Sequence, residues 1–450
     1  MMYRKFLRIL ICVLFINFFI PFQNLNAMEK KLLILNDGYK NYGEKTNILQ
    51  EIIKTTLSMK YEIKSVTFNN FNDVNFNEYD SIIILKNDHI DFSDSMINKI
   101  KDYKDKILVL DNSIEEERVI GIKGDTNKFI KLSELDENLK AKAVKEFIYN
   151  NLNHEMLTNN TYLILDEMYP IDELNDVIVK IDYLYNLGIP FIVSAMPIFN
   201  NEDIEAVERY YEVLRYAQAK GGSIVLHFPD VNKEGVVNIN IDNLINKMTT
   251  SYKYFINYQV YPRAIDIPEE FLYHDRINDY LKLTDTLFLD SNKISLSKDN
   301  INLKHMNNLI EKIPYDDFYN KLEYKNNLGI SITSNIDFDK FKNILQSLNK
   351  REIYFNDFSY LDTYLNMGEN QIESKEANLY LNNKNINVQR FISREEFKSS
   401  INKDEKIEEE NTIDLSNFNK WLIIITSLAS IIFIIIAIRN RRIDRNKFFK

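Results

Sequence analysis

Cysteine is almost absent from this sequence of 450 residues. The one cysteine, Cys12, lies in an apolar segment near the N-terminus, so the rest of the chain can form no disulfide. A fold without disulfides depends on a large hydrophobic core. The sequence can supply one, because 45% of its residues are hydrophobic, with 28 Phe and 27 Tyr. The length predicts two or three domains.

Glycine-rich phosphate-binding motifs and an excess of positive charge are also missing. The first expected strand is followed by Asn36-Asp37-Gly38-Tyr39, which matches neither the dinucleotide fingerprint nor a P-loop, so nothing supports nucleotide binding. The formal net charge is -10, which argues against nucleic acid or anionic lipid as a ligand. A neutral or cationic polymer remains compatible with this charge.

Both ends of the chain carry a long apolar segment. Residues 1–27 run from basic residues through an apolar stretch to Ala27, the order of a cleavable secretory signal peptide, with an uncleaved anchor as the alternative. Residues 421–438 contain no charge and are followed by a strongly basic tail at 439–450. Such a stretch can span a bilayer, with its basic flank inside. We therefore expect a single-pass cell-membrane protein with an extracellular ectodomain and a cytoplasmic tail.

Residues 28–150 alternate short apolar runs with amphipathic ones. Strands are expected at 32–35, 61–68, 81–85 and 107–110, and helices at 46–59 and 93–103. This alternation is typical of a parallel sheet that is covered on both faces. We expect a flavodoxin-like α/β domain here.

A second α/β region is expected at 155–365. A strand at 162–166 precedes a helix that closes at Gly188, and strand, helix and strand follow at 189–196, 204–217 and 223–227. Further apolar runs at 264–267, 286–289, 329–333 and 352–355 can complete a distorted barrel or a large open sheet. The remaining expected segments are a small β appendage at 366–400, a linker at 401–420, the transmembrane helix at 421–438 and the tail at 439–450.

Polar side chains follow two of these strands. Asp166 and Glu167 end one strand, and His227 ends another. In barrels of alternating strands and helices the active site lies at the carboxyl ends of the strands. These residues can therefore share a metal or act as an acid and base pair. The alternative is structural, with the acids at a helix N-terminus and His227 as a hydrogen-bonded core residue.

Three ordered motifs, Leu163 to Pro170, Leu187 to Phe191 with Met196-Pro197, and Ala217 to His227, resemble those of polysaccharide deacetylases. More closely, they resemble an uncharacterised branch of that superfamily, found in bacterial surface proteins and Pel-type exopolysaccharide operons. The similarity covers about residues 160–360 and is dense from 162 to 227. It implies a distorted (β/α) barrel and an ancestral, metal-dependent removal of N-acetyl groups from a polysaccharide.

The resemblance also assigns roles to single residues. It implies that Asp166 is the base and that Glu167 stands in the position of a metal-ligating aspartate. His227 matches the first histidine of a His-x-x-x-His motif, but the second position is Val231, which cannot bind a metal. Asp230 would have to reach the metal from a different position.

Two later motifs of the family are altered as well, at Pro268-Glu269-Glu270 and at Thr333-Ser334-Asn335. A catalytic zinc normally keeps three protein ligands and one open position, and general acid help contributes about 10²- to 10⁴-fold. We therefore expect that catalysis is lost and that no cofactor binds, with zinc or another divalent metal required only if the protein is active.

The sequence gives less support for a functional role of several other residues. Tyr169, Phe199 and Phe228 follow expected strands and could stack on sugar rings, although aromatic residues are more often part of the core. His274 and His305 lie in charged stretches that we expect to be helical surface.

These observations favour a membrane-anchored, deacetylase-like pseudoenzyme that binds or guides a cell-surface or exported polysaccharide. An active metal-dependent polysaccharide N-deacetylase with an Asp/Glu/His site is the first alternative. A structural partner of exopolysaccharide synthesis or secretion proteins is the second.

Overall fold

The computed structural model describes residues 30–37, 48–87, 94–112, 128–152, 160–200, 204–229, 239–290, 301–320 and 327–388. These residues belong to one compact unit, Met1–Phe391. The expected signal peptide, linker, transmembrane helix and tail lie outside the described residues. Within the described ranges, no helix is both long enough and apolar enough to cross a membrane.

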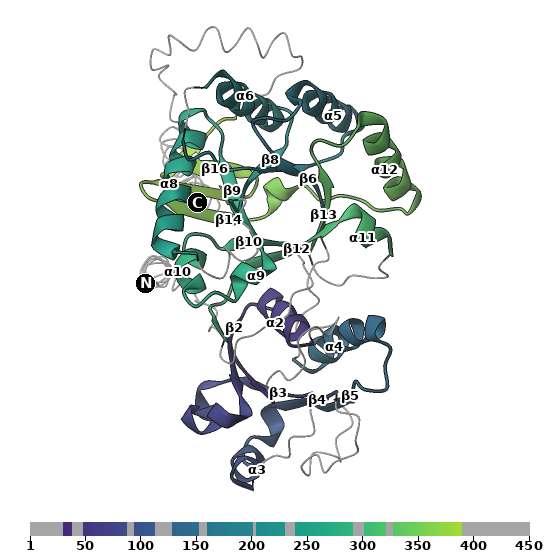
Figure 1. Cartoon of the computed structure of the whole chain (residues 1–450), viewed down its shortest axis with the longest axis vertical. Helices are drawn as coiled ribbons and strands as arrows, with labels where there is room; N and C mark the ends of the chain where they lie inside the picture. The colour runs from purple at the N-terminus through teal and green to yellow at the C-terminus, as the bar shows by residue number, and fades with distance from the viewer. Residues whose placement is uncertain are drawn as a thin grey trace, which may run out of the picture. The chain divides into compact units, whose positions relative to one another are not determined.

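The N-terminal part of the chain is a parallel sheet (Figure 1). Its strands lie in the order β2 (Tyr61–Thr67), β1 (Lys30–Asn36), β3 (Ser81–Lys86), β4 (Ile107–Asp111) and β5 (Phe129–Lys131). The order 2-1-3-4-5 is typical of flavodoxin-like sheets. Residues 32–35 are all fully buried, as expected for a parallel strand covered on both faces. The prediction of a parallel sheet is confirmed.

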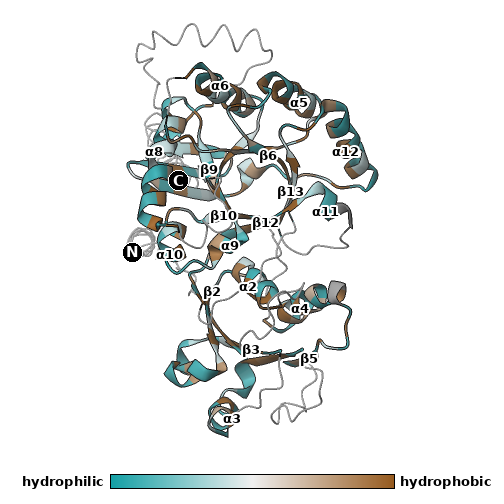
Figure 2. Ribbon diagram, viewed as in Figure 1, coloured by the Kyte–Doolittle hydropathy of each residue, from teal (hydrophilic) through white to brown (hydrophobic). Residues whose placement is uncertain are grey.

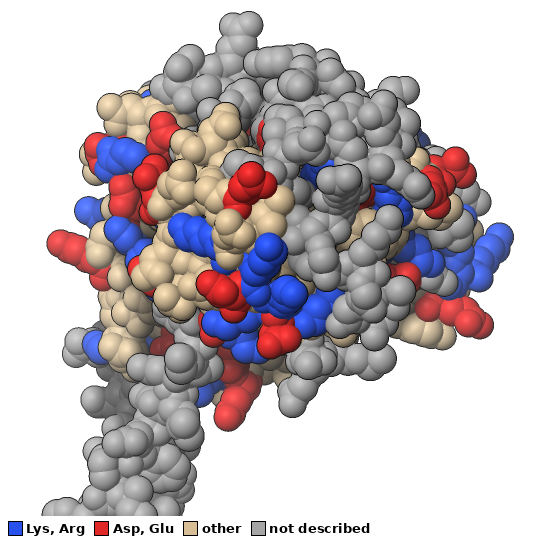
Figure 3. All heavy atoms as spheres, turned by 90° about the horizontal axis from the view of Figure 1, so that it is seen from below, with Lys and Arg blue, Asp and Glu red and all other residues tan. Residues whose placement is uncertain are grey.

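Helices cover this sheet because its strands are apolar on both sides. Met96 and Ile100 of α3 (Asp94–Lys101) join Leu33 and Leu35 in one core cluster, while α2 (Ile48–Ser58) packs against α4 (Glu137–Asn151). Short 3-10 turns lie at 68–73, 76–78 and 104–106. Where described residues are visible in Figure 3, acidic and basic side chains are interspersed.

The second region is a closed barrel of seven parallel strands. In sequence order the strands are β6 (Thr161–Met168), β7 (Ile192–Ala195), β8 (Ser223–His227), β9 (Pro262–Pro268), β10 (Thr286–Asp290), β12 (Asn308–Pro314) and β13 (Leu328–Thr333). The barrel closes in the order β10-β12-β13-β6-β7-β8-β9. The prediction of a barrel is confirmed, and the open sheet is excluded.

Helices surround the barrel, and apolar residues line its strands (Figures 1 and 2). The helices are α5 (Leu174–Leu187), α6 (Glu205–Ala219), α8 (Ile241–Asn257), α9 (Glu269–Leu272), α10 (Ile277–Leu281), α11 (Tyr315–Asn320) and α12 (Phe338–Lys350). Helix α5 ends at Gly188, which has a left-handed φ of 65°, as predicted. Gly329 permits close packing in the barrel, because a Cβ there would lie 2.4 Å from Ile164 Cδ1.

Aromatic side chains fill the barrel toward the amino ends of its strands. Phe358, in the 3-10 turn η5 (Phe358–Tyr360), makes edge contacts with the rings of Tyr162 and Phe288. Ile164, Val225 and other strand residues complete this cluster. The interior of the barrel is therefore packed with apolar side chains at this end. The carboxyl ends of the strands carry charged side chains that face one another.

A four-stranded antiparallel sheet follows the barrel in sequence, formed by β14 (Thr363–Met367), β15 (Asn370–Lys375), β16 (Asn378–Leu381) and β17 (Lys384–Ile386). Its position agrees with the expected β appendage. Two other expectations are wrong. Residues 352–355 form no strand, since the chain turns there toward the hydrogen bond from Asn356 N to Thr161 O. His274 and His305 lie in connections rather than in helices.

The sequence did not predict the junction between the two α/β regions. Strand β11 (Ile301–Leu303) lies between β10 and β12 in sequence, yet it pairs antiparallel with β2 of the N-terminal sheet. Beside it, a buried charge network of Glu51, Lys54, Lys145, Glu269 and Glu311 links helices α2 and α4 to α9 and β12. Both features join the two regions into one folded body.

Candidate functional site

A cluster of charged residues lies at the carboxyl ends of the barrel strands. Asp166 comes from β6, His227 from β8, Asp266 from β9 and Lys312 from β12. Asp266 is paired in register with His227, and Asp290 of β10 with Lys312. Strand pairing therefore brings together five titratable side chains that are far apart in the sequence.

Lys312 lies between two carboxylates in this ion-pair centre. Its Nζ is 2.7 Å from Asp266 Oδ2 and 3.0 Å from both oxygens of Asp166. Lys312 and Asp266 are each 2% exposed, and Asp166 is 7% exposed. These contacts are charge-assisted hydrogen bonds in an environment largely shielded from water, where such pairs are strongest.

The charges of their neighbours keep Asp166 and Lys312 ionised. Burial alone would raise the pKa of Asp166, but the Lys312 ammonium and His227 outweigh it and lower that pKa below its ordinary value. Burial would lower the pKa of Lys312, but Asp166, Asp266 and Asp290 together raise it far above its ordinary value. Lys312 therefore remains a cation and cannot act as an amine nucleophile.

His227 and Ser194 complete the surroundings of Asp266. Ser194 Oγ donates a hydrogen bond of 2.9 Å to Asp266 Oδ2. The Nδ1 of His227 lies 2.6 Å from the Phe228 carbonyl oxygen, and its Nε2 lies 3.9 Å from Asp266 Oδ2. A proton on Nδ1 satisfies the contact with the carbonyl and leaves the Nε2 lone pair directed toward the centre.

Asp290 is a half-buried carboxyl at the edge of the centre. Burial raises its pKa to about 6, with Lys312 acting against that rise and the other carboxylates adding to it. Near neutral pH a fraction of Asp290 is therefore protonated. It can donate a hydrogen bond in a site whose other carboxylates only accept.

The centre can be tested for its fit to a metal ion. One ligand atom each from Asp166, His227 and Asp266 lie within 4.8 Å of one another, a donor set that suits zinc. However, the Lys312 ammonium already bridges the same two carboxylates. A metal about 2.0 to 2.2 Å from their oxygens would meet that charge at close range. The residues fit a metal only if Lys312 moves away.

The structure brings only two of the predicted catalytic and metal-binding residues together in the centre. Asp166 and His227 lie in the centre together, whereas Glu167 is exposed and has a left-handed φ of 52°. Asp230 lies outside the described residues. Phe228 is 2% exposed and packs against Phe271, so it is part of the core.

Two other aromatic candidates remain accessible. Tyr169 and Phe199 are half-buried, and Lys247 Nζ lies 5.9 Å from the centre of the Phe199 ring. A contact with sugar remains a prediction for both residues.

Asp266 and Lys312 were missed by sequence reasoning. Asp266 is the one charged residue in the apolar run Ala264-Ile265-Asp266-Ile267, and Lys312 follows Glu311 in the otherwise apolar run Leu309-Ile310-Glu311-Lys312-Ile313. A lone charge facing a packed interior needs a partner of opposite sign. This rule could have identified Asp266 from the sequence, because residues 264–267 were expected to form a strand. It could not have identified Lys312, because β12 was not predicted from the sequence.

Comparison with known proteins gives distant structural matches. No protein-family model and no curated protein matches the sequence. A CE4 family pseudoenzyme from Bacillus anthracis matches with a TM-score of 0.30 and 8% identity, over 46% of this chain and 66% of that one, slightly less than two thirds. A peptidoglycan N-acetylglucosamine deacetylase gives a TM-score of 0.28 and 10% identity, over 45% and 88% of the two chains.

A family 4 carbohydrate esterase from Bacillus anthracis gives a TM-score of 0.24 and 10% identity, over 45% of this chain and 82% of that chain. Likenesses at these values carry no argument about activity. The barrel assignment rests on the strand pairing of this chain itself.

Proposed function

We propose that this protein is a membrane-anchored, non-catalytic relative of polysaccharide deacetylases that binds or guides a cell-surface or exported polysaccharide. The observation that carries the proposal is the position of Lys312, whose ammonium bridges Asp166 and Asp266. The motifs at 163–170 and 217–227 and the parallel barrel support the relation to deacetylases. The apolar ends of the sequence support the membrane location.

Lys312 supplies internally the positive charge that a deacetylase takes from its metal. A metal ion polarises the bound carbonyl oxygen and lowers the pKa of a bound water. A lysine held between two carboxylates can do neither at a comparable strength, because its charge is compensated by them and two of its three N–H groups already donate to them. We therefore infer that the centre is a structural ion pair within the parallel barrel.

The test uses the full-length protein, purified in mild detergent after exposure to zinc or cobalt. We expect much less than one metal per chain by elemental analysis and no acetate release from N-acetylglucosamine or N-acetylgalactosamine oligomers. We also expect retention of the protein on an immobilised polysaccharide. Failure to bind any of a panel of bacterial polysaccharides would count against the binding role.

An active deacetylase is the second candidate, favoured by the grouping of Asp166, His227 and Asp266. In that case Lys312 would leave the carboxylates when a metal enters. One metal per chain, lost in His227→Ala, together with acetate release that is lost in Asp166→Asn, would establish the enzyme. Lys342→Ala, an exposed position on α12, is the matched control.

A further inference from the structure

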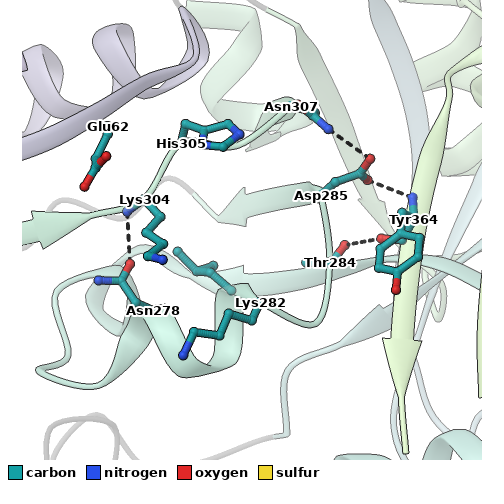
Figure 4. Close-up of a pocket in the computed structure, with 10 residues that line it drawn as sticks. Glu62, Asn278, Lys282, Thr284, Asp285, Lys304, His305, Asn307 and Tyr364 are labelled. Carbon is teal, nitrogen blue, oxygen red and sulfur yellow. Dashed lines mark hydrogen bonds between the residues drawn. The ribbon is translucent and has the colours of Figure 1, made fainter. Parts of the chain in front are cut away.

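A pocket of about 330 Å³, lined mainly by residues that carry polar groups, lies at the opposite end of the barrel from the ion-pair centre (Figure 4). Its walls come from four separate parts of the chain: Glu62 of β2, helix α10 with its connection to β10, the connection from β11 to β12, and Tyr364 of β14. This volume is at the small end of the range of ligand pockets, about 300 to 1,000 Å³. It suits a ligand of the size of one sugar unit.

Hydrogen bonds fix the walls of this pocket. Asn278 Oδ1 accepts from Lys304 N at 3.0 Å, and Thr284 Oγ1 donates to the Tyr364 carbonyl oxygen at 3.1 Å. Asp285 accepts from Tyr364 N at 2.7 Å and from Asn307 Nδ2 at 3.2 Å. Because these bonds join all the barrel segments, the pocket is preformed, and binding needs little ordering of the protein.

Most charged side chains of the pocket have a hydrogen-bond or ion-pair partner. Asp285 is turned toward Asn307 and the backbone of Tyr364 (Figure 4), and Thr286 Oγ1 also donates to it. Lys282 forms an ion pair with Asp279, with 2.9 Å between Nζ and Oδ1. Glu62 forms a longer ion pair with Lys31, with 3.8 Å between Oε2 and Nζ.

Lys304 differs from these groups. Within the described part of the chain its ammonium has no ion-pair partner. The pocket therefore offers one cation that is free for a ligand.

This pocket is separate from the ion-pair centre. Asp285 precedes the first residue of β10, and Asp290 ends that strand at the centre. Five residues of a strand span about 16 Å. A ligand of the size of one sugar in the pocket cannot touch Lys312.

We propose that this pocket binds a hydroxyl-rich, sugar-sized ligand with one anionic group, a carboxylate or a phosphate. Lys304 pairs with that group, and the Glu62 carboxylate accepts hydrogen bonds from hydroxyls on the other side. The site is additional to the proposed polysaccharide role of the barrel. It gives the protein a second contact for an acidic unit, in a molecule whose net charge of -10 would otherwise repel one.

Calorimetric titration of the full-length protein with three probes tests this site: methyl glucuronide, glucose 6-phosphate and neutral methyl glucoside. We expect saturable binding of at least one anionic probe, weakened by added salt, and weaker binding of the neutral one. The anionic probe that binds more tightly identifies carboxylate or phosphate as the preferred group.

Variants of Lys304 make the test specific. Lys304→Ala should weaken binding of the anionic probe about fivefold, the upper end expected for one solvent-exposed charge pair, and Lys304→Arg should restore it. Lys342→Ala should have no effect. No saturable binding, equal binding of the neutral probe, or binding unchanged in Lys304→Ala would overturn the proposal. None of these outcomes bears on the metal and acetate measurements at the barrel centre.

Discussion

Lys312 decides the chemistry of the barrel because it is buried between two carboxylates. Removing one partner of a buried ion pair costs about 3 to 5 kcal/mol, since the charge left behind has neither water nor a counter-ion. Asp166 and Asp266 would both be left in this way. Lys312 is therefore expected to stabilise the fold, in addition to its proposed role in excluding a metal ion.

Lys312→Ala tests this at the residue scale. At neutral pH we expect a clear loss of thermal stability, measured by intrinsic fluorescence, because two buried carboxylates lose their cation. Zinc or cobalt should restore part of the melting temperature, since Asp166, His227 and Asp266 can then share the ion. A melting temperature that equals the wild-type value without metal would contradict this account. Lys342→Ala again serves as control.

Glu167 allows a second test. Its φ of 52° is unfavourable for a residue with a side chain, and such strain costs of order 1 kcal/mol or more. We expect Glu167→Gly to raise the free energy of unfolding by about 1 kcal/mol if the carboxylate has no structural partner. A decrease in stability would show that the exposed side chain makes a contact that outweighs the strain.

Single residues also show where sequence reasoning reached its limit. Asp166 and His227 could be placed at strand ends because recognisable strands precede them. Lys312 could not, because Glu311 and Lys312 interrupt the apolar pattern of β12. Those two charges are satisfied on opposite faces of one strand, by partners that include Lys54 and Asp166, each more than a hundred residues away in sequence.

At the scale of elements, β12 and the end of β9 each serve two sites. On β12, Lys312 faces the barrel centre, and its neighbour Glu311 joins the charge network at the junction. Asp266 of β9 faces the centre, and Glu269, the first residue of α9 directly after that strand, joins the network. On β12 the alternation of side chains along a strand makes this possible. A shift of either strand would disturb both sites together.

Glu269 gives the junction a dependence on pH. Burial raises its pKa to about 7, although Lys54 acts against the rise; Glu51 and Glu311 add to it. The folded protein thus holds this proton more tightly than the unfolded chain, whose carboxyl has an ordinary pKa near 4.5. The free energy of unfolding therefore falls as pH rises from about 4.5 to 7, by about 3 kcal/mol in total.

Glu269→Gln should remove this decrease in the free energy of unfolding with rising pH, because glutamine is neutral at every pH. We expect the variant to unfold at a higher temperature than the wild type at pH 8 and to show little change between pH 5 and 8. Thermal unfolding at a series of pH values measures both effects. The neighbouring substitution Glu270→Gln should keep the pH dependence of the wild-type unfolding temperature. If the unfolding temperatures of the two variants changed with pH in the same way, the assignment of this dependence to Glu269 would be wrong.

At the scale of the whole molecule, the order of elements was predictable and the joining of the two regions was not. Hydrophobic periodicity located strands β1 to β4 of the N-terminal sheet and six of the seven barrel strands, because each contains a short apolar or alternating run, but it did not locate β5. Strand β11 has three residues and no distinctive pattern. Its pairing with β2 depends on tertiary structure that no local pattern records.

The junction predicts that the barrel is not an independent domain. Residues 155–388 expressed alone would lose Lys54 and Lys145, the cations that pair with Glu269 and Glu311, together with the helices that cover these carboxylates, and would leave β11 unpaired. We expect this fragment to be largely insoluble or to unfold at a much lower temperature than the full-length protein. A soluble fragment with an unchanged melting temperature would contradict this.

The membrane location remains a prediction that rests on residues 421–438. Ending the chain after residue 415 should release the protein from the membrane fraction into the medium, because the apolar segment and its basic flank are then absent. Cell fractionation with immunoblotting measures the change. Protease added to intact cells should degrade the full-length ectodomain; protection of that ectodomain would reverse the proposed orientation.

The pairing of β11 with β2 also constrains the order of events during synthesis. Ile301 pairs with Ser65, roughly 240 residues earlier, so the ribosome needs about 10 to 50 seconds after β2 has been made to supply its neighbour. Throughout that interval one edge of the N-terminal sheet has unpaired backbone groups, open to pairing with another nascent chain. A chaperone that shields this edge would raise the yield of correctly folded protein, and slow translation of residues 150–300 would lower it.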